Sequence, residues 1–461
     1  MGAIGGAMAS LAEVQQLFVT GRRGEAKALL TQLVDGSEDP NLLARATALF
    51  SQMAAHREAL DCHRALHHRF PTHPPILRAL AAAETACGLL GEAEAHLDQA
   101  IAFDRSEADD WYNRSVLRRQ TADRNHVAAL RSRIAEAKGG DVAPLAYALA
   151  KELEDLGEHP ESFTWLKRGA DARRARLSYR VEGDVEAMAS IERTFSADKL
   201  GRPVAGASPF RPVFIVGLPR TGTTLLEQML GMHPGLVALG ELTELPMAVV
   251  RAAGTGDKSE TIRRAAQIDF AAFGQDYLRA VAGYGPDGRT SIDKLPSNFL
   301  YIGMLRLGLP DARVVHLRRH PADTAYAVFK TLFRMGYPYS YDLKDLGLYY
   351  GAYHRLMEHW RLAAPGYVID VDYEDLVEAP EQTLRSLLKR LDLEWDPRCL
   401  EFQSADGPVA TASAAQVREP VHARSVGLWR RHLDGMAPFI DTLREQGIAV
   451  EAAAGALAPD A

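Results

Sequence analysis

The stretch GLPRTGTT, residues 217–224, brings two glycines, a cation and three hydroxyls into one turn between an apolar run and a helix-like run. Gly217 and Gly222 keep the spacing of a phosphate-binding loop, G-x-x-x-x-G-K-[ST], but Thr223 stands where that loop has its lysine. Backbone amides at a helix N-terminus bind phosphate or sulfate oxygens. The missing lysine normally serves the β and γ phosphates of a magnesium–triphosphate ligand. With Arg220 in the turn instead, the pattern favours a nucleotide whose single 5′-phosphate is linked to another anionic group.

Six segments between residues 210 and 435 resemble the sulfotransferases, which take a sulfuryl group from 3′-phosphoadenosine 5′-phosphosulfate (PAPS). The likeness is to tetratricopeptide-repeat sulfotransferases and, more distantly, to tyrosylprotein sulfotransferases. The segments are GLPRTGTT, HPGLVALGELTEL, DKLPSNF, VVHLRRHPADTAYAV, VDYEDLV and QVREPVHARSVGLWRRH.

The resemblance implies a role for several residues of this chain. The 5′-phosphosulfate loop falls on Arg220, Thr221, Gly222, Thr223 and Thr224. Glu241 matches the catalytic glutamate, and Lys294 matches a lysine that assists at the reacting sulfate. The other nucleotide contacts fall on Arg319 for the 3′-phosphate, on Tyr373 beside the adenine, and on Arg418 and Arg424 in a late loop that closes over the nucleotide.

One position departs from the family pattern. The 3′-phosphate segment normally has a serine eight residues after its arginine, and this chain has Ala327 there. A hydroxyl donor is therefore lost. The residues that could compensate are Thr324, Lys330, Arg418 and Arg424.

Elementary chemistry agrees with these roles. By analogy with phosphoryl transfer, sulfuryl transfer depends on positioning and on stabilising the charge of the leaving phosphate oxygen. Arg220, Lys294 and the loop amides could supply that field without a metal, and no His/Cys cluster has metal-ligand spacing. An acceptor hydroxyl must lose a proton, and a phenol of pKa near 10 needs a base within reach. We expect Glu241 to be that base, with Glu244 as the alternative.

The first part of the chain reads as helix after helix, with a marker that recurs in steps of 33, 34, 33 and 33 residues. The clear copies are Gly24-Glu25-Ala26, Arg57-Glu58-Ala59 and Gly91-Glu92-Ala93, and weaker ones begin at Arg124 and Gly157. This period resembles the tetratricopeptide repeat, with a degenerate fourth copy; a non-repeating helical bundle is the alternative. Such arrays usually offer a groove for a protein partner or for self-association.

The predicted fold is therefore an all-α tetratricopeptide-like helical array followed by an α/β P-loop-like domain with a mainly parallel sheet. Strands are expected at 213–216, 313–317 and 367–371, with a further short strand at 291–293. The predicted organisation is a disordered start at 1–10, repeats at 11–182, a connecting helix and linker at 183–209, the sulfotransferase domain at 210–448 and a flexible tail at 449–461. We expect the charged stretch 167–180 to extend the last repeat helix, which would stop at Gly183-Asp184.

Composition sets the remaining limits. The net charge of −7 argues against a general nucleic-acid binder. The three cysteines are far apart in sequence, and no run of 18 apolar residues appears, so we expect a cytoplasmic protein that does not span a membrane.

The acceptor remains open among protein tyrosine, carbohydrate, lipid and small-molecule hydroxyls, with an amine as a second choice. Two other interpretations also stay open: a P-loop kinase that uses ATP, and an inactive nucleotide-binding scaffold.

Overall fold

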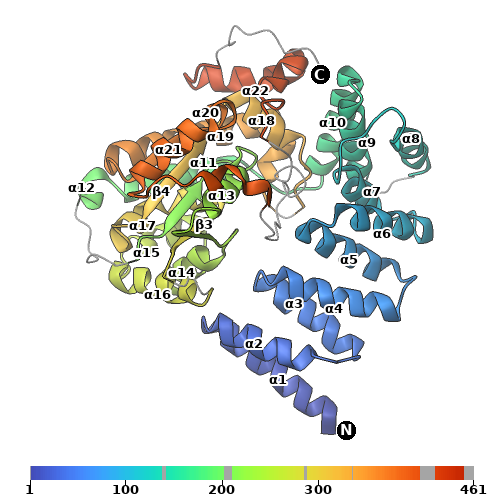
Figure 1. Cartoon of the computed structure of the whole chain (residues 1–461). Coiled ribbons are helices and arrows are strands. Elements are labelled where there is room, and N and C mark those ends of the chain that lie inside the picture. The colour runs from blue at the N-terminus through green and yellow to red at the C-terminus, as the bar shows by residue number, and fades with distance from the viewer. Residues whose placement is uncertain are drawn as a thin grey trace. The chain divides into compact units, whose positions relative to one another are not determined.

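The computed structural model describes residues 2–137, 142–201, 210–284, 288–334, 336–404 and 421–450. The chain forms two compact units (Figure 1). One holds Met1–Leu156, and the other holds most of the chain from Gly157 onward.

The first unit is built of helices that follow one another along the chain (Figure 1). They are α1 (Gly2–Val19), α2 (Arg23–Val34), α3 (Pro40–Gln52), α4 (His56–Arg69), α5 (Pro74–Cys87), α6 (Leu90–Phe103), α7 (Ala108–Ser115), α8 (Val127–Glu136) and α9 (Ala143–Asp155). The alanines of the three clear sequence markers, Ala26, Ala59 and Ala93, are all buried near the start of α2, α4 and α6. A small side chain at each point lets neighbouring helices approach closely. The 33- to 34-residue period is thus present in the packing, while membership of the tetratricopeptide class stays a prediction.

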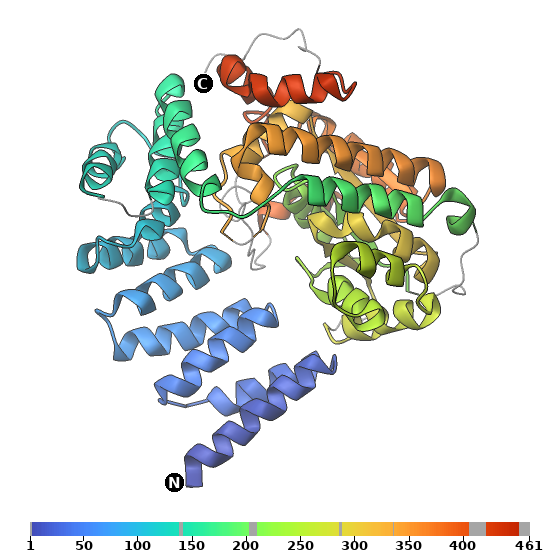
Figure 2. The same cartoon turned by 180° about the vertical axis from the view of Figure 1, so that it is seen from behind.

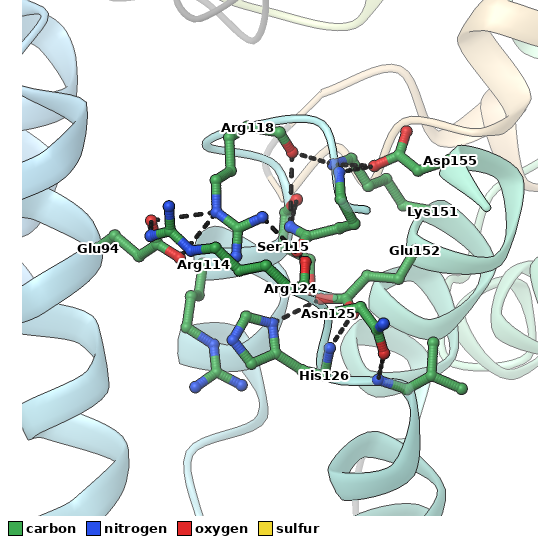
Figure 3. Close-up of polar contacts among 12 residues, drawn as sticks. Glu94, Arg114, Ser115, Arg118, Arg124, Asn125, His126, Lys151, Glu152 and Asp155 are labelled. Carbon is green, nitrogen blue, oxygen red and sulfur yellow. Dashed lines mark hydrogen bonds and ion pairs between the residues drawn. The ribbon is translucent and has the colours of Figure 1, made fainter. Parts of the chain in front are cut away.

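The later helices of this unit are tied by buried polar contacts (Figure 3). Glu152 of α9 is fully buried and accepts hydrogen bonds from the Ser115 hydroxyl at 2.7 Å and from the backbone N–H of His126 at 2.5 Å. Glu94 of α6 accepts a hydrogen bond from Arg118 at 2.9 Å. These contacts anchor both ends of the irregular connection between α7 and α8. The fourth predicted repeat, whose sequence marker is weak, is therefore held by buried polar contacts.

The boundary between the two units differs from the expected one. The second unit begins with α10 (His159–Arg174), followed by α11 (Glu182–Thr194) and α12 (Ala197–Leu200). The predicted helical extension to residue 180 is wrong, because the Arg174 guanidinium donates to the carbonyls of Leu177 and Tyr179 and turns the chain back. The predicted stop at Gly183-Asp184 is also wrong. Both residues lie in the first turn of α11, where the acidic Glu182 and Asp184 suit a helix N-terminus.

Helix α10 packs within the second unit. The ring of Phe163 stacks on His432 with centroids 5.0 Å apart. It also fills the space beside Gly435, where a Cβ atom would lie only 2.2 Å from the ring. Arg174 forms an ion pair with Asp345 at 2.9 Å. These contacts explain why α10, expected among the repeats of 11–182, belongs to the α/β unit.

A five-stranded sheet forms the centre of the second unit. Its strands are β1 (Val213–Val216), β2 (Leu236–Ala238), β3 (Thr290–Lys294), β4 (Arg313–Arg318) and β5 (Val368–Asp372), in the order β2-β3-β1-β4-β5. Every described pairing is parallel. Central β1 is buried along its whole length, as its continuous apolar sequence indicates. The parallel sheet is confirmed, and the sequence missed only the three-residue β2 among these strands.

Helices surround this sheet. They are α13 (Thr223–Gly231), α14 (Glu244–Ala253), α15 (Lys258–Ala265), α16 (Phe270–Ala282), α17 (Ile302–Gly308), α18 (Pro321–Phe329), α19 (Leu343–Ala363), α20 (Tyr373–Glu378), α21 (Pro380–Arg390) and α22 (Leu433–Glu445). Long α19 runs alongside α11 (Figure 2). Within the described residues, no helix is both long and apolar enough to cross a membrane.

The ends and the linker were also subjects of prediction. Residues 2–10, expected to lack regular structure, form the first half of α1, because their alanines favour helix and continue the helix of residues 11–19. Most of the predicted linker, residues 202–209, lies outside the described residues. The same holds for residues 451–461 of the predicted tail.

The position of α10 leads to a prediction about where the second unit can be separated. A fragment that begins at Gly157 keeps Phe163 and Arg174, and we expect it to unfold in one cooperative thermal transition. A fragment that begins at Val185 lacks these contacts and exposes the surface beside Gly435, so we expect a lower melting temperature or aggregation. Calorimetric scans of the two fragments test this, and equal melting temperatures would show that α10 is dispensable.

Candidate active site

The candidate residues meet because parallel strands end at the same edge of a sheet. The loop 217–224 follows β1, and Lys294 is the last residue of β3. Arg319 follows the end of β4, and Tyr373 follows the end of β5. Since β1 pairs with both β3 and β4, the loop lies between the ends of these two strands.

The loop after β1 is a tight turn that only small residues permit at two points. Gly222 has φ +98°, and a Cβ atom there would lie 2.5 Å from the Tyr373 ring. A Cβ on Gly217 would lie 2.7 Å from the Leu317 carbonyl oxygen. Arg220 adopts the left-handed region with φ +67°, which is uncommon for a residue with a side chain. Thr223 then begins α13. The backbone of this turn is therefore held in an unusual conformation at the N-terminus of a helix.

Glu241 and Lys294 form an ion pair at the ends of β2 and β3. The Lys294 Nζ lies 2.6 Å from Glu241 Oε1, and the lysine side chain is fully buried whereas that of Glu241 is 39% exposed. The amide of Lys294 also donates to the Gly240 carbonyl at 3.1 Å. The structure thus brings together two of the three predicted catalytic residues. A carboxylate open to solvent beside a buried ammonium suits a base that must reach an acceptor.

A third charged residue, Glu227 of α13, reaches the same place, and sequence reasoning missed it. Its Oε2 lies 3.7 Å from Lys294 Nζ, and its Oε1 accepts a hydrogen bond from the Gly240 N–H at 2.8 Å. Burial raises the pKa of the Glu227 carboxyl. The signal was available, because a glutamate interrupts the apolar run LLEQML directly after the loop.

Asp293, next to Lys294, is a second buried acid that the sequence did not single out. Its carboxylate accepts hydrogen bonds from the Tyr277 hydroxyl at 2.9 Å and from the Asn298 amide at 3.3 Å. Burial raises its pKa to about 8, and the charge of Glu227 adds to the effect. Asp293 therefore holds a proton at neutral pH, which limits the negative charge close to the Glu241–Lys294 ion pair.

An aromatic side chain lies near Glu241. Burial, together with the charge of Glu241, raises the pKa of Tyr337 to about 12. Tyr337 has φ +50° and contacts Phe333 edge-to-face with centroids 4.8 Å apart. Tyr337 and its aromatic neighbour Phe333 thus lie on the side of the site where Glu241 is found.

Arg319 ties three loops together. Its guanidinium donates to the carbonyl of Arg220 at 3.0 Å and to that of Ser425 at 2.6 Å, and it lies 4.7 Å from the centroid of the Tyr373 ring. The Tyr373 hydroxyl forms a hydrogen bond with the Ser425 hydroxyl at 2.8 Å. Among the described atoms, the buried Nε of Arg319 has no hydrogen-bond partner. The sequence predicted Arg319 and Tyr373 here but missed Ser425.

The segment after residue 420 is also held from α18. Buried Asp323 accepts a hydrogen bond from the backbone N–H of Gly427 at 2.7 Å. His320 stacks on Trp429 with centroids 5.4 Å apart. Arg424 lies in this segment and is exposed. Arg418 lies outside the described residues.

The position where the family has a serine, Ala327 here, is buried inside helix α18. The Ala327 carbonyl accepts the Thr331 hydroxyl at 2.8 Å. One turn earlier, Thr324 is buried and donates to the Arg319 carbonyl at 3.3 Å. Lys330 lies over the Tyr326 ring at 4.9 Å. Of the four residues that could replace the lost hydroxyl, Thr324 therefore contacts the backbone of Arg319 directly.

The histidines near this edge are packed into the fold. His316 of β4 contacts Asp370 at 2.7 Å and also hydrogen-bonds the Tyr353 hydroxyl. Burial lowers the pKa of His316. These contacts agree with a structural role for this ring. In the part of the chain that is described, no group of three or more His, Cys, Asp and Glu residues could hold a metal ion.

The sheet, with a glycine loop that runs from β1 into α13, defines a P-loop-like α/β domain. Residues 212–397 match the model of the sulfotransferase family. The chain is 31% identical over 411 residues to an uncharacterized protein of Aquifex aeolicus, a match that covers 84% of this chain and 52% of the relative. The chain thus spans about half the length of that relative.

Two further similarities concern a protein-tyrosine sulfotransferase and a solved sulfotransferase domain. Over 238 residues the chain is 26% identical to a protein-tyrosine sulfotransferase of Drosophila melanogaster, covering 48% of each protein. The solved sulfotransferase domain of the Synechococcus olefin synthase is 21% identical, with a TM-score of 0.39, and the match covers 54% of this chain and 99% of that domain.

The buried acid Asp293 gives a prediction for stability against pH. Because its pKa is raised to about 8, the folded chain keeps a proton that the unfolded chain releases above about pH 4. The free energy of unfolding should therefore fall as pH rises from about 4 to 8, by roughly 1.4 kcal/mol per unit from this group. Asp293→Asn should remove that slope, as measured by urea unfolding across this range. The exposed Asp198→Asn is the control, and equal slopes in both variants would contradict the raised pKa.

Proposed function

We propose that the second unit transfers a sulfuryl group from PAPS to an acceptor hydroxyl, without a metal, and that Glu241 is the general base. The observation that carries this proposal is the pairing of Glu241 with buried Lys294 at 2.6 Å, at the same sheet edge as the lysine-free loop. A family domain supplies the reaction class, and the ion pair supplies a base and a cation for it.

The residues at the sheet edge fit a 3′,5′-bisphosphorylated nucleotide of this kind. The amides of the loop and of the start of α13 would hold the 5′-phosphosulfate, together with Arg220, Thr221 and Thr224. Arg319 has a buried Nε that still lacks a partner among the described atoms, which suits a bound 3′-phosphate. The Tyr373 ring would lie beside the adenine, and the exposed Arg424 suits a closing contact.

The reaction can be balanced with residues of this chain. PAPS supplies an activated sulfuryl group, whose bond to the 5′-phosphate oxygen breaks as a new O–S bond forms to the acceptor. Glu241 takes the proton from the acceptor hydroxyl. Lys294 and Arg220 oppose the negative charge that develops at the transferring group and at the leaving oxygen. The fixed loop and the buried lysine hold these charges in place before reaction.

The first unit has a separate proposed role. Its helices recur with the period of repeat proteins, in which each repeat buries only against its neighbours. We propose that they bind a protein partner or a second copy of the chain. The proposed chemistry uses residues of the second unit alone.

Nucleotide preference separates this function from its runner-up, an ATP-dependent kinase. Since the loop has Thr223 in place of the lysine that serves β and γ phosphates, we expect calorimetry in EDTA to give tighter binding of 3′-phosphoadenosine 5′-phosphate than of ATP. Magnesium-dependent binding that favours ATP would falsify the sulfotransferase proposal.

Arg319 should matter for the 3′-phosphate. We expect Arg319→Ala to weaken 3′-phosphoadenosine 5′-phosphate at least about 10-fold more than adenosine 5′-phosphate, because a charge-assisted contact is lost only with the former. Arg318→Ala is the matched control, since Arg318 pairs with Asp372 at 2.7 Å instead. Equal losses for both nucleotides would assign the 3′-phosphate to another residue.

The base assignment has its own test. Glu241→Gln keeps the size of the side chain but cannot take the proton. We expect turnover to fall roughly 100- to 10,000-fold, which is about 3–5 kcal/mol of barrier, with nearly unchanged nucleotide affinity. Transfer from labelled PAPS, measured with Glu244→Gln in parallel, checks this. Normal turnover in Glu241→Gln together with loss in Glu244→Gln would move the base to Glu244.

A further inference from the structure

Glu227 is a buried carboxylate that the proposed mechanism does not yet use. It lies in the second turn of α13, the helix that the phosphate-binding loop opens, and its side chain is only 3% exposed. An ionised carboxylate in such a place is costly unless charged and polar groups compensate for its burial. Here the compensation is specific, because one oxygen faces the Gly240 N–H and the other faces the Lys294 ammonium.

The first of these contacts fixes the backbone just before the base. Gly240 has φ +77°, so the chain turns sharply there before Glu241. The Gly240 N–H donates to Glu227 at 2.8 Å, and the Gly240 carbonyl accepts from the Lys294 amide at 3.1 Å. Both backbone polar groups of Gly240, the residue before Glu241, are thus fixed. One anchor comes from α13 and the other from β3.

The second contact concerns charge. The Lys294 ammonium lies 2.6 Å from Glu241 and 3.7 Å from Glu227, so one buried cation is shared by two carboxylates. When Glu241 takes up the acceptor's proton, its negative charge is neutralised. Glu227 is then the carboxylate that remains beside the ammonium. A lone buried ammonium would be strongly disfavoured.

We propose that Glu227 is a positioning residue for sulfuryl transfer, which holds the turn that presents Glu241 and remains as the opposite charge beside Lys294 while Glu241 carries the proton. This inference rests on the proposed function. Glu227 also connects the proposed donor site with the proposed base, because it lies on α13, the helix that follows the loop 217–224, and contacts Gly240 directly before Glu241. The other ionisable groups nearby are Asp293 on β3, Glu244 at the start of α14, Tyr277 on α16 and Tyr337.

Three variants separate the two contacts in the full chain. Glu227→Gln keeps an oxygen for the Gly240 N–H but removes the charge, and Glu227→Ala removes both. Glu227→Asp keeps the charge with a shorter reach. Glu260→Gln on the exposed face of α15 is the matched control. The measurements are calorimetric affinity for 3′-phosphoadenosine 5′-phosphate, turnover, and hydrogen exchange of the Gly240 amide.

For Glu227→Gln we expect nucleotide affinity to change less than about threefold and turnover to fall up to about 100-fold, because Lys294 loses one of the two carboxylates that hold its ammonium and a displacement of about 1 Å can cost that much. Glu227→Asp, which keeps the charge, should restore much of the turnover. The Gly240 amide should stay protected in Glu227→Gln and exchange faster in Glu227→Ala.

An unchanged turnover in Glu227→Gln would overturn the charge role, and a protected Gly240 amide in Glu227→Ala would overturn the positioning role. The outcome is distinct from failure of the proposed function. If the natural chain transfers no sulfuryl group, the proposed function fails, whereas hydrogen exchange at Gly240 still tests whether Glu227 holds the turn.

Discussion

The arrangement of the site depends on the parallel pairing of β1 with β3 on one side and β4 on the other. Ile215 is in register with Lys294, and Val216 with His316, so the residues that follow β1 emerge between the ends of its two neighbours. The loop therefore has the Lys294–Glu241 pair on one side and Arg319 on the other. Parallel strands cannot be joined by a tight hairpin and need long crossover connections. In this chain the connections between β1 and β4 contain the helices α13 to α17. Local sequence builds each part, and the sheet order brings the parts together.

The second constraint is the burial of charge at this edge. A fully buried lysine is tolerated because two carboxylates face it, and a neighbouring acid, Asp293, avoids adding a third charge by keeping its proton. Such an arrangement is weak as a source of stability, because the desolvation of the ions offsets their attraction. Its value lies in fixed geometry, since none of these groups can move far without leaving a charge unpaired.

Much of this fold and site could be predicted from the sequence, for identifiable reasons. The strand β1 is a short apolar run followed by a glycine loop, a pattern that few other local structures can produce. Its predicted bounds were confirmed. The loop residues and the Glu241–Lys294 pair came from motif resemblance, which records spatial proximity that spacing alone cannot give. In contrast, β2 has three residues and no periodicity to detect. The interrupted apolar run marks Glu227 as unusual, but its contact with Gly240, like that of Ser425 with Arg319, arises only from the way the sheet places the loops. The end of α10 depends on Arg174 reaching two carbonyls, a contact that no local propensity predicts.

The segment from Ser425 to His432 is held at both of its ends. At one end Arg319 and Asp323 bind its backbone. At the other end it runs into the short helix Leu428–His432, which α10 contacts through Phe163. A stretch anchored in this way opens as one cooperative unit rather than by gradual fraying. Because one of its anchors is Phe163 of α10, a change in that helix would alter how readily the whole segment opens.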